Sequence, residues 1–175
     1  MHSGLHEFIP SIQSLRKIDQ NTIDKAIKNW DRNMWENGIS AVGDITNGID
    51  TLAIKMESQI QYHNFIELFG LRMAKAEEIL ENGRRVLQKF KQEGLSANLV
   101  PHSPYAVSDP LFKMIAAASK AHPISLHNQE TLGERQLFED EKGPLKAMLE
   151  NFGNDPDEMR KETSNSLLHA LQFFP

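Results

Sequence analysis

The order of apolar runs and histidines between Leu99 and Arg135 restricts the fold of this chain more than any other feature. One apolar run ends at His102, and the stretch from Val107 to Ala121 that follows has apolar residues at helical spacing. A second run then ends at His127. The order strand, histidine, helix, strand, histidine is that of a βαβ crossover, which builds parallel sheets. Ligands of parallel sheets and barrels bind at the carboxyl ends of strands, where both histidines fall.

The residues around the two histidines form two motifs. Residues 101–108 read PHSPYAVS and residues 125–134 read SLHNQETLGE. Together they resemble the metal-dependent amidohydrolase superfamily, in the branch of cytosine, guanine and adenosine deaminases and chlorotriazine hydrolases. That branch has P-H-[AS]-P-Y-x-[CV]-S at barrel strand four and H-x-x-E-[TS]-x-x-E at strand five. Both patterns occur here in that order, about one βα unit apart. Because each lies where the other predicts it, the pair supports the resemblance more strongly than either pattern alone.

The remaining elements are predicted from periodicity and turn residues. We expect a helix over 5–18 and a second one that begins at Asn21 or Thr22 and ends at Asn37 and Gly38. Further helices are expected over 50–58, 71–93, 107–121, 145–152 and 164–174. We expect strands over 39–45, 62–70, at the run that ends in His102, and over 123–127, and a turn over 154–157. GISAVGD and FIELFG resemble the second and third barrel strands of the family. The predicted fold class is therefore α/β, a partial TIM (β/α)8 barrel with about four parallel strands, barrel strands two to five, and flanking helices.

The chain is shorter than a whole barrel requires. A complete eightfold barrel takes about 250 residues, whereas this chain has 175. We expect one partial barrel domain over 1–175, in which 5–135 carry the resemblance and 136–175 form a helical insertion and end. Such a fragment has open sheet edges, so we expect a homo-oligomer or association with the rest of the barrel through those edges.

Composition excludes several classes of partner. The chain carries 19 basic and 24 acidic residues, a net charge of −5, which argues against a nucleic-acid partner. It has no cysteine, so disulfides and thiolate metal sites are excluded, and this fits a reducing cytoplasm. No apolar run approaches the roughly 18 residues that indicate a membrane helix. A small-molecule substrate is the partner we expect.

The resemblance implies attack of a metal-bound hydroxide on an amidine or related carbon, because a divalent ion lowers the pKa of bound water to about 7. It implies that His127 is a metal ligand and that Glu130 takes the proton from the water and returns it to the leaving nitrogen. It also implies that His102 orients or polarises the substrate, with Tyr105 and Ser103 shaping the pocket. Strand four carries no lysine that would bridge two metals, so a single Zn²⁺ or Fe²⁺ is expected.

Each of these residues also has a purely structural interpretation. Glu67, a carboxylate near the end of the third strand, can contact substrate or only pair with a lysine or arginine. His127 can be a core or surface histidine, and Glu130 and Glu134 can be first-turn helix carboxylates favoured by the helix dipole. Asp44 at the tip of the second strand is expected to cap the following turn rather than to function. His63 and His122 are expected to be structural, and His2, His6 and His169 belong to no motif.

The family's metal site is incomplete in this sequence. Its first strand brings a His-x-His pair, which does not occur here, and further ligands come from strands six and eight. Of the family's ligands only His127 can be assigned here, whereas a catalytic metal site usually needs three protein ligands and a water. Whether this chain alone is an enzyme is therefore open.

The leading functional hypothesis is a metal-dependent hydrolase of non-peptide carbon–nitrogen bonds, which deaminates a cyclic amidine or purine-like ring. The alternative is a catalytically inactive half-barrel that acts as a scaffold or interaction module. A barrel hydrolase that uses Glu67 and Glu130 as a carboxylate pair is a further alternative, although it leaves both histidine motifs unexplained.

Overall fold

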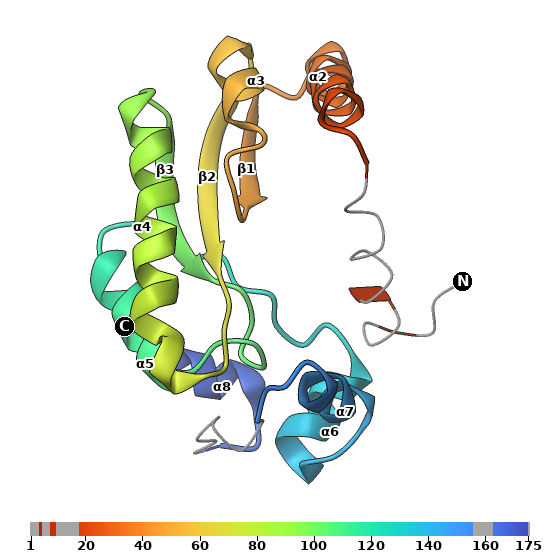
Figure 1. Cartoon of the computed structure of the whole chain (residues 1–175), viewed down its shortest axis with the longest axis vertical. Helices are drawn as coiled ribbons and strands as arrows, with labels where there is room; N and C mark the ends of the chain where they lie inside the picture. Colours follow the sequence, from red (N-terminus) through yellow and green to blue (C-terminus); the bar gives the residue numbers. More distant parts are fainter. Residues whose placement is uncertain (1–3, 5–7, 10–17, 156–162, 175) are drawn as a thin grey trace.

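Three parallel strands form the centre of the structure, a computed structural model that describes residue 4 and residues 8–9, 18–155 and 163–174. They are β1 (Ala41–Thr46), β2 (Gln61–Leu68) and β3 (Ser96–Pro101), and they lie in the sheet in chain order. Because all three run in the same direction, their carboxyl ends meet at one edge, the lower end of the sheet in Figure 1. The α/β class with parallel strands is thus confirmed.

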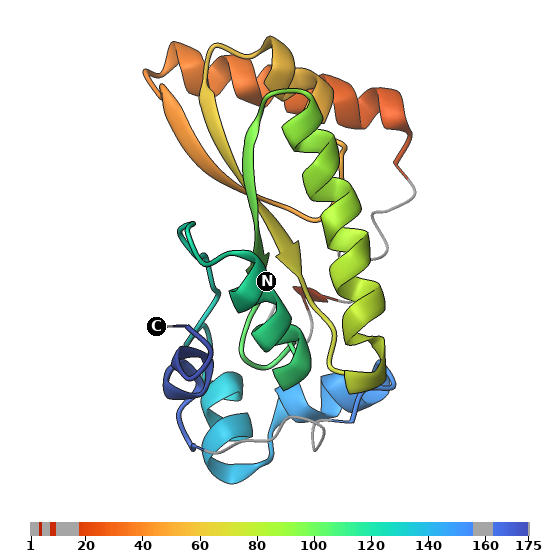
Figure 2. The same cartoon turned by 90° about the vertical axis from the view of Figure 1, so that its left-hand side faces the viewer.

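The helices flank the sheet or gather beyond its carboxyl edge. They are α2 (Gln20–Glu36), α3 (Leu52–Glu57), α4 (Ala76–Gln92, after a 3-10 turn at Met73–Lys75), α5 (Asp109–Ala118), α6 (Leu132–Asp140), α7 (Pro144–Asn151) and α8 (Ser166–Leu171). Figure 2 shows α4 running along β2 and β3, while α6, α7 and α8 lie below the strands. None of the helices in these described ranges is long and apolar enough to cross a membrane.

The main core lies between the sheet and the helices α4 and α5. Ile66 of β2 and Leu99 of β3 pack there with Phe90 of α4 and Phe112 of α5, all at most 1% exposed. The apolar positions of α4 recur every three to four residues, so one face of this charged helix is buried and the other is solvated. A second cluster forms beyond the strands, where α6 and α7 pack on the loop after β3. The strand ends therefore lie between two packed regions, which hold them in place.

Several boundaries differ from those expected from the sequence. The cap of α2 is Asp19 rather than Asn21 or Thr22, because its carboxylate accepts a hydrogen bond from the Thr22 backbone nitrogen at 3.0 Å, the usual N-cap geometry. The α6 helix begins where the structural interpretation of Glu130 and Glu134 allows a helix, although the sequence did not predict its bounds. It forms because Thr131 caps it, accepting from the Glu134 nitrogen. The expected helix over 5–18 and the turn over 154–157 lie largely outside the described residues.

The expected strand over 123–127 is absent from the part of the chain that the structure describes, so the sheet has three strands instead of about four. Proline at position 123 has no N–H to donate, and its carbonyl accepts from the side chain of Asn98 at 3.0 Å. One backbone bond, from His127 N to His102 O at 2.8 Å, joins this segment to the chain after β3. The segment therefore lacks the ladder of backbone hydrogen bonds that defines a strand.

Asp44 has a structural role, although not the expected one. It lies in β1 and forms an ion pair with Lys55, whose side chain is 4% exposed and also donates to Asn64 Oδ1 at 2.6 Å. A buried lysine requires such partners because removing its charge from water is costly. Asp44 therefore fixes α3 against the sheet rather than capping the turn after β1.

Candidate active site

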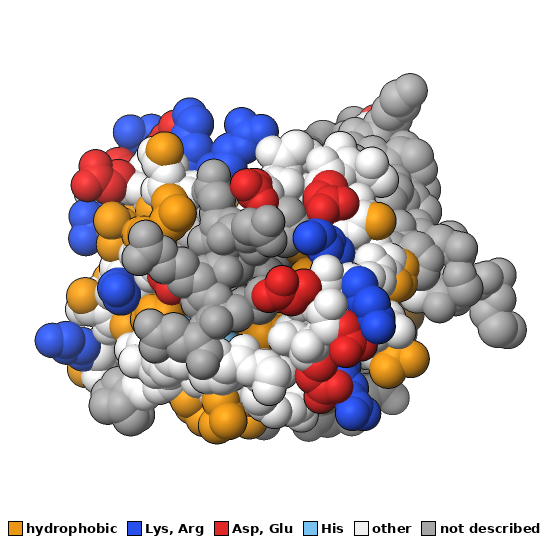
Figure 3. All heavy atoms as spheres, turned by 90° about the horizontal axis from the view of Figure 1, so that it is seen from below, with side chains coloured by type: hydrophobic (Ala, Val, Ile, Leu, Met, Phe, Trp, Pro, Cys, Tyr) orange, Lys and Arg blue, Asp and Glu red, His pale blue; other side chains and the backbone are white. Residues whose placement is uncertain are grey.

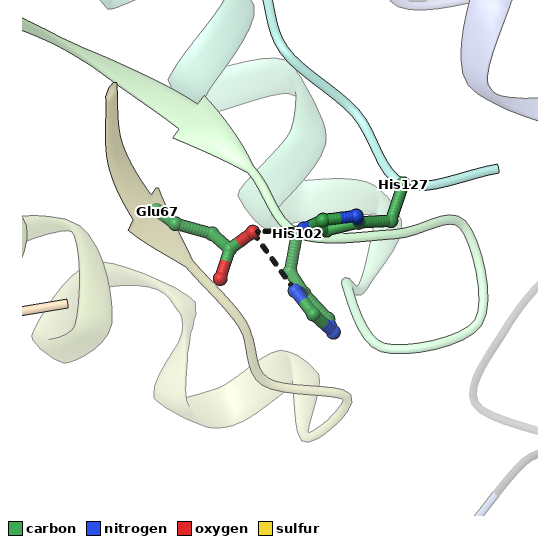
Figure 4. A group of neighbouring side chains, drawn as sticks. All are labelled: Glu67, His102 and His127. Atoms are coloured by element: carbon green, nitrogen blue, oxygen red, sulfur yellow. Dashed lines mark ion pairs between the residues drawn. The ribbon is translucent and has the colours of Figure 1, made fainter. Parts of the chain in front are cut away.

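Three side chains converge at the carboxyl ends of the strands, and Figure 4 shows them pointing toward one another. Glu67 comes from the end of β2, His102 follows β3 directly, and His127 lies on the extended segment after α5. The Oε1 atom of Glu67 is 2.9 Å from His102 Nδ1 and 3.1 Å from His127 Nε2. One carboxylate oxygen thus contacts both imidazole rings. We call these three residues the Glu67 cluster.

Backbone hydrogen bonds fix the three positions relative to one another. His102 N donates to Leu68 O at 2.9 Å, which extends the β2–β3 ladder by one residue. His127 N donates to His102 O at 2.8 Å. The side chain of Asn47, which sequence analysis did not identify, donates to Glu67 at its carbonyl oxygen and at Oε2, at 3.1 and 3.2 Å.

The carboxylate of Glu67 is buried, with 6% of its side chain exposed. Burial raises the pKa of Glu67, but the His102 imidazole, the Asn47 amide and the neighbouring His127 together lower it by more, so the pKa lies below its usual value. Glu67 is therefore a carboxylate anion at neutral pH. Its partners are imidazoles, not the lysine or arginine of the structural interpretation.

Glu130 lies on the other side of the His127 ring. Its Oε1 atom is 3.8 Å from His127 Nδ1, while Glu67 faces His127 Nε2. The buried hydroxyl of Tyr105 donates to Glu130 Oε2 at 2.6 Å. Burial, and secondly this hydrogen bond, raise the pKa of Tyr105, so its hydroxyl stays protonated and donates. Glu67 and Glu130 thus lie on opposite sides of the His127 ring. His102 contacts Glu67, and Tyr105 contacts Glu130.

The Glu67 cluster fits a divalent metal ion. Its three ligand atoms lie within 4.8 Å of one another. Two ligands bound to one zinc ion at about 2.1 Å lie roughly 3.0–3.4 Å apart, close to the two distances from Glu67 Oε1. A carboxylate with two imidazoles suits Zn²⁺ or Fe²⁺, and the half-exposed His127 leaves the group open on one side. The sequence motifs assigned only His127 to a metal.

The other singled-out residues lie apart from this cluster or support it. Ser103, which directly follows His102, is fully buried. His63, at the start of β2, contacts Ser96 Oγ and Asn98 Oδ1 at the opposite end of the strand. His122 is exposed, and the buried His169 lies 3.3 Å from Asp109. His2 and His6 lie outside the described residues.

Comparisons with known proteins agree with the geometry. No protein-family model matches the chain. An aminodeoxyfutalosine deaminase of Deinococcus radiodurans is 27% identical over 114 residues, which are 62% of this chain and 27% of that protein. Two crystal structures of Helicobacter pylori aminofutalosine deaminase, one of them in complex with methylthio-coformycin, align over 82% of this chain. Their TM-scores are 0.64 and 0.66, and their identities 23% and 22%.

These relatives are considerably longer than this chain, which spans about a quarter to a third of their length. The structural likeness confirms the expected fold, part of a TIM barrel. The sequence similarity to a deaminase adds independent support for the resemblance of the two histidine motifs. This chain is thus similar in sequence to a deaminase and similar in fold to part of the aminofutalosine deaminase structures, in agreement with the resemblance to the amidohydrolase superfamily.

Proposed function

We propose that this chain carries part of the active site of a metal-dependent hydrolase that deaminates a cyclic amidine or purine-like ring. The observation that carries the proposal is the convergence of Glu67, His102 and His127 at the carboxyl ends of the strands, with Glu130 beside them. The relatives are named as deaminases, which supports this reaction class.

Within this proposal His127, with Glu67 and His102 in reach, would hold a single divalent ion, Zn²⁺ or Fe²⁺, which when bound would activate a water. Glu130 would accept a proton beside His127 and return it to the leaving nitrogen. Tyr105 holds the Glu130 carboxylate through its hydroxyl at 2.6 Å. His102 and Glu67 can instead orient the substrate, as the sequence motifs imply, and their contact with His127 is compatible with either role.

The alternative function is a half-barrel without catalysis, which serves as a scaffold or interaction module. One observation supports it: of the family's metal ligands, only His127 can be assigned within the residues given. The carboxylate-pair hydrolase is less well supported, because Glu67 and Glu130 face opposite nitrogens of the His127 ring. A cytoplasmic location stays a prediction from the sequence.

Release of ammonia tests the catalytic proposal. A longer protein that contains this chain together with the remaining strands of the barrel, purified without chelator and supplied with Zn²⁺ or Fe²⁺, is incubated with a panel of aminated purines, pyrimidines and triazines. We expect ammonia from at least one compound, and a loss of at least about 100-fold in kcat for Glu130→Gln, since general acid–base groups contribute about 10²–10⁴-fold. Glu139→Gln, an exposed carboxylate on α6 paired with Arg135, is the matched control. A chain that binds the ion but releases no ammonia from any compound would favour the scaffold.

A further inference from the structure

Glu134 is a buried carboxylate that the roles proposed above leave unused. It lies in the first turn of α6 and is 1% exposed. Its Oε2 accepts a hydrogen bond from the Glu130 backbone nitrogen at 2.9 Å, and its Oε1 accepts from the Gln129 nitrogen at 3.0 Å. The side-chain amide of Asn128 lies 3.4 Å from Oε1. All three donors belong to the loop over residues 128–130, which separates His127 from α6.

This pattern differs from an ordinary helix cap. In a capping box, the glutamate three residues after the N-cap bonds back to the backbone N–H of the N-cap residue itself. Here the N-cap is Thr131, and Glu134 reaches the amides one and two residues before it. The carboxylate therefore binds the 128–130 loop to the helix and does more than complete the helix end.

The 128–130 loop has a conformation that needs such support. Gln129 has a φ of 55°, in the left-handed region that side chains other than glycine rarely adopt. Strained backbone of this kind persists where the surrounding structure fixes it, and it is frequent at functional sites. The turn at Gln129 directs Glu130 back toward Tyr105, whose hydroxyl it accepts at 2.6 Å.

The loop is held at both ends. At its start, His127 N donates to His102 O at 2.8 Å, and the Asn128 amide also donates to Ser166 Oγ of α8 at 3.0 Å. At its end, Glu134 binds the backbone amide of Glu130 itself and that of the preceding residue, Gln129. The carboxylate accepts each amide on a separate oxygen, whereas a glutamine of the same size has a single acceptor oxygen and would present its NH₂ donors in place of the other.

We propose that Glu134 is a positioning residue, which sets the Glu130 carboxylate between Tyr105 and His127 by binding the amides of Gln129 and Glu130. Its importance for catalysis rests on the proposed function, because Glu130 transfers a proton only in that function. The positioning itself is a property of the folded chain and is measurable without turnover.

A double-mutant cycle tests the proposal. Tyr105→Phe removes the hydroxyl that Glu130 accepts, and we expect it to raise the unfolding equilibrium constant about fivefold, the usual effect of one hydrogen bond. In a Glu134→Gln background we expect less than a twofold change, because Glu130 is no longer held against Tyr105. In a Glu139→Gln background, on the same helix but paired with Arg135, the fivefold effect should remain. An unchanged fivefold effect in Glu134→Gln would show that Glu134 stabilises only its own turn, and would overturn the proposal.

Nuclear magnetic resonance provides a second readout, which also serves if Glu134→Gln fails to fold. In the unaltered chain we expect scalar couplings across the hydrogen bonds from the Gln129 and Glu130 nitrogens to the Glu134 carboxyl carbon, and their absence would overturn the proposal. In Glu134→Gln, exchange of these two amides should become at least about tenfold faster, with no change in Glu139→Gln. Neither experiment depends on activity, so a failure of the ammonia assay and a failure of the positioning role are distinguishable.

Discussion

The two ring nitrogens of His127 face two different carboxylates, Glu67 at Nε2 and Glu130 at Nδ1. This arrangement gives the ring a fixed orientation, because each nitrogen has its own acidic neighbour. A histidine that binds a metal through one nitrogen typically has such a partner at the other, which orients the ring and raises its basicity. The purely structural interpretation of His127 as an isolated core or surface histidine is therefore less well supported than that of a functional residue.

Glu67→Gln separates the two roles open to Glu67. If its carboxylate is a metal ligand, the affinity of the chain for Zn²⁺ or Co²⁺ should fall at least about 100-fold, because even changes to groups behind the ligands cost about 10–100-fold. Isothermal titration and the visible spectrum of the Co²⁺ form measure the effect. His122→Gln removes an exposed imidazole outside the cluster and should leave the affinity unchanged. An unaltered affinity in Glu67→Gln would leave Glu67 with the substrate role alone.

Among the elements, α4 and the two strands that it covers show how closely the core packs. Gly83 on the buried face of α4 lies against Leu68 of β2, and a Cβ built there would come within 2.5 Å of a Leu68 methyl group. The absence of a side chain at Gly83 therefore allows the helix to approach the strand that ends near the Glu67 cluster. Leu68 directly follows Glu67, so packing at this point supports the position of the carboxylate.

Gly83→Ala is expected to destabilise the chain by about 1–2 kcal/mol. The added methyl group overpacks the contact with Leu68, which typically costs about 1–3 kcal/mol, and the gain of up to about 1 kcal/mol in helix propensity offsets only part of it. Urea unfolding followed by circular dichroism measures the change. Gly133→Ala, whose Cβ would have ordinary contacts in α6, is the control and should be neutral or stabilising. A stabilising Gly83→Ala would show that the α4–β2 contact relaxes easily.

At the scale of the whole molecule, the described part of the chain is an open structure. The order β1-β2-β3 leaves the outer edge of β1 without a neighbouring strand among the described residues. The α2 helix has no fully buried residue, and Trp30 on it is 67% exposed. The opposite end of the molecule has acidic and basic side chains interspersed over its surface (Figure 3). The apolar and unpaired groups near β1 therefore indicate where a further chain can bind.

We expect the protein to self-associate, or to bind the remaining part of a barrel, through the β1 edge. Sedimentation velocity over a wide concentration range should show a reversible oligomer. A charged side chain on an edge strand opposes such pairing, so Val42→Lys in β1 should shift the equilibrium toward monomer. Met56→Lys, an equally polar change on the exposed side of α3, should not. A monodisperse monomer at every concentration would contradict the prediction.

The local sequence pattern predicted much of the secondary structure of this protein. Periodicity and turn residues indicated most of the helices and the three strands, because a strand or an amphipathic helix is encoded within a few turns of chain. The histidine motifs indicated the candidate site, because carboxyl ends of parallel strands meet at one edge. The single partial domain over 1–175 stays a prediction from the same reasoning.

Only the tertiary structure decided which side chains meet. Sequence spacing cannot show that Glu67 Oε1 contacts both imidazoles, since the three residues lie on separate segments up to 60 positions apart. It also could not show that Glu134 binds the 128–130 loop, because the same residue fits an ordinary capping box. The segment over 123–127 has no N–H at Pro123 and joins the chain after β3 through the backbone bond at His127 instead of a strand ladder. Contacts between distant segments, and the competition among their hydrogen bonds, are set by packing in three dimensions and not by local pattern.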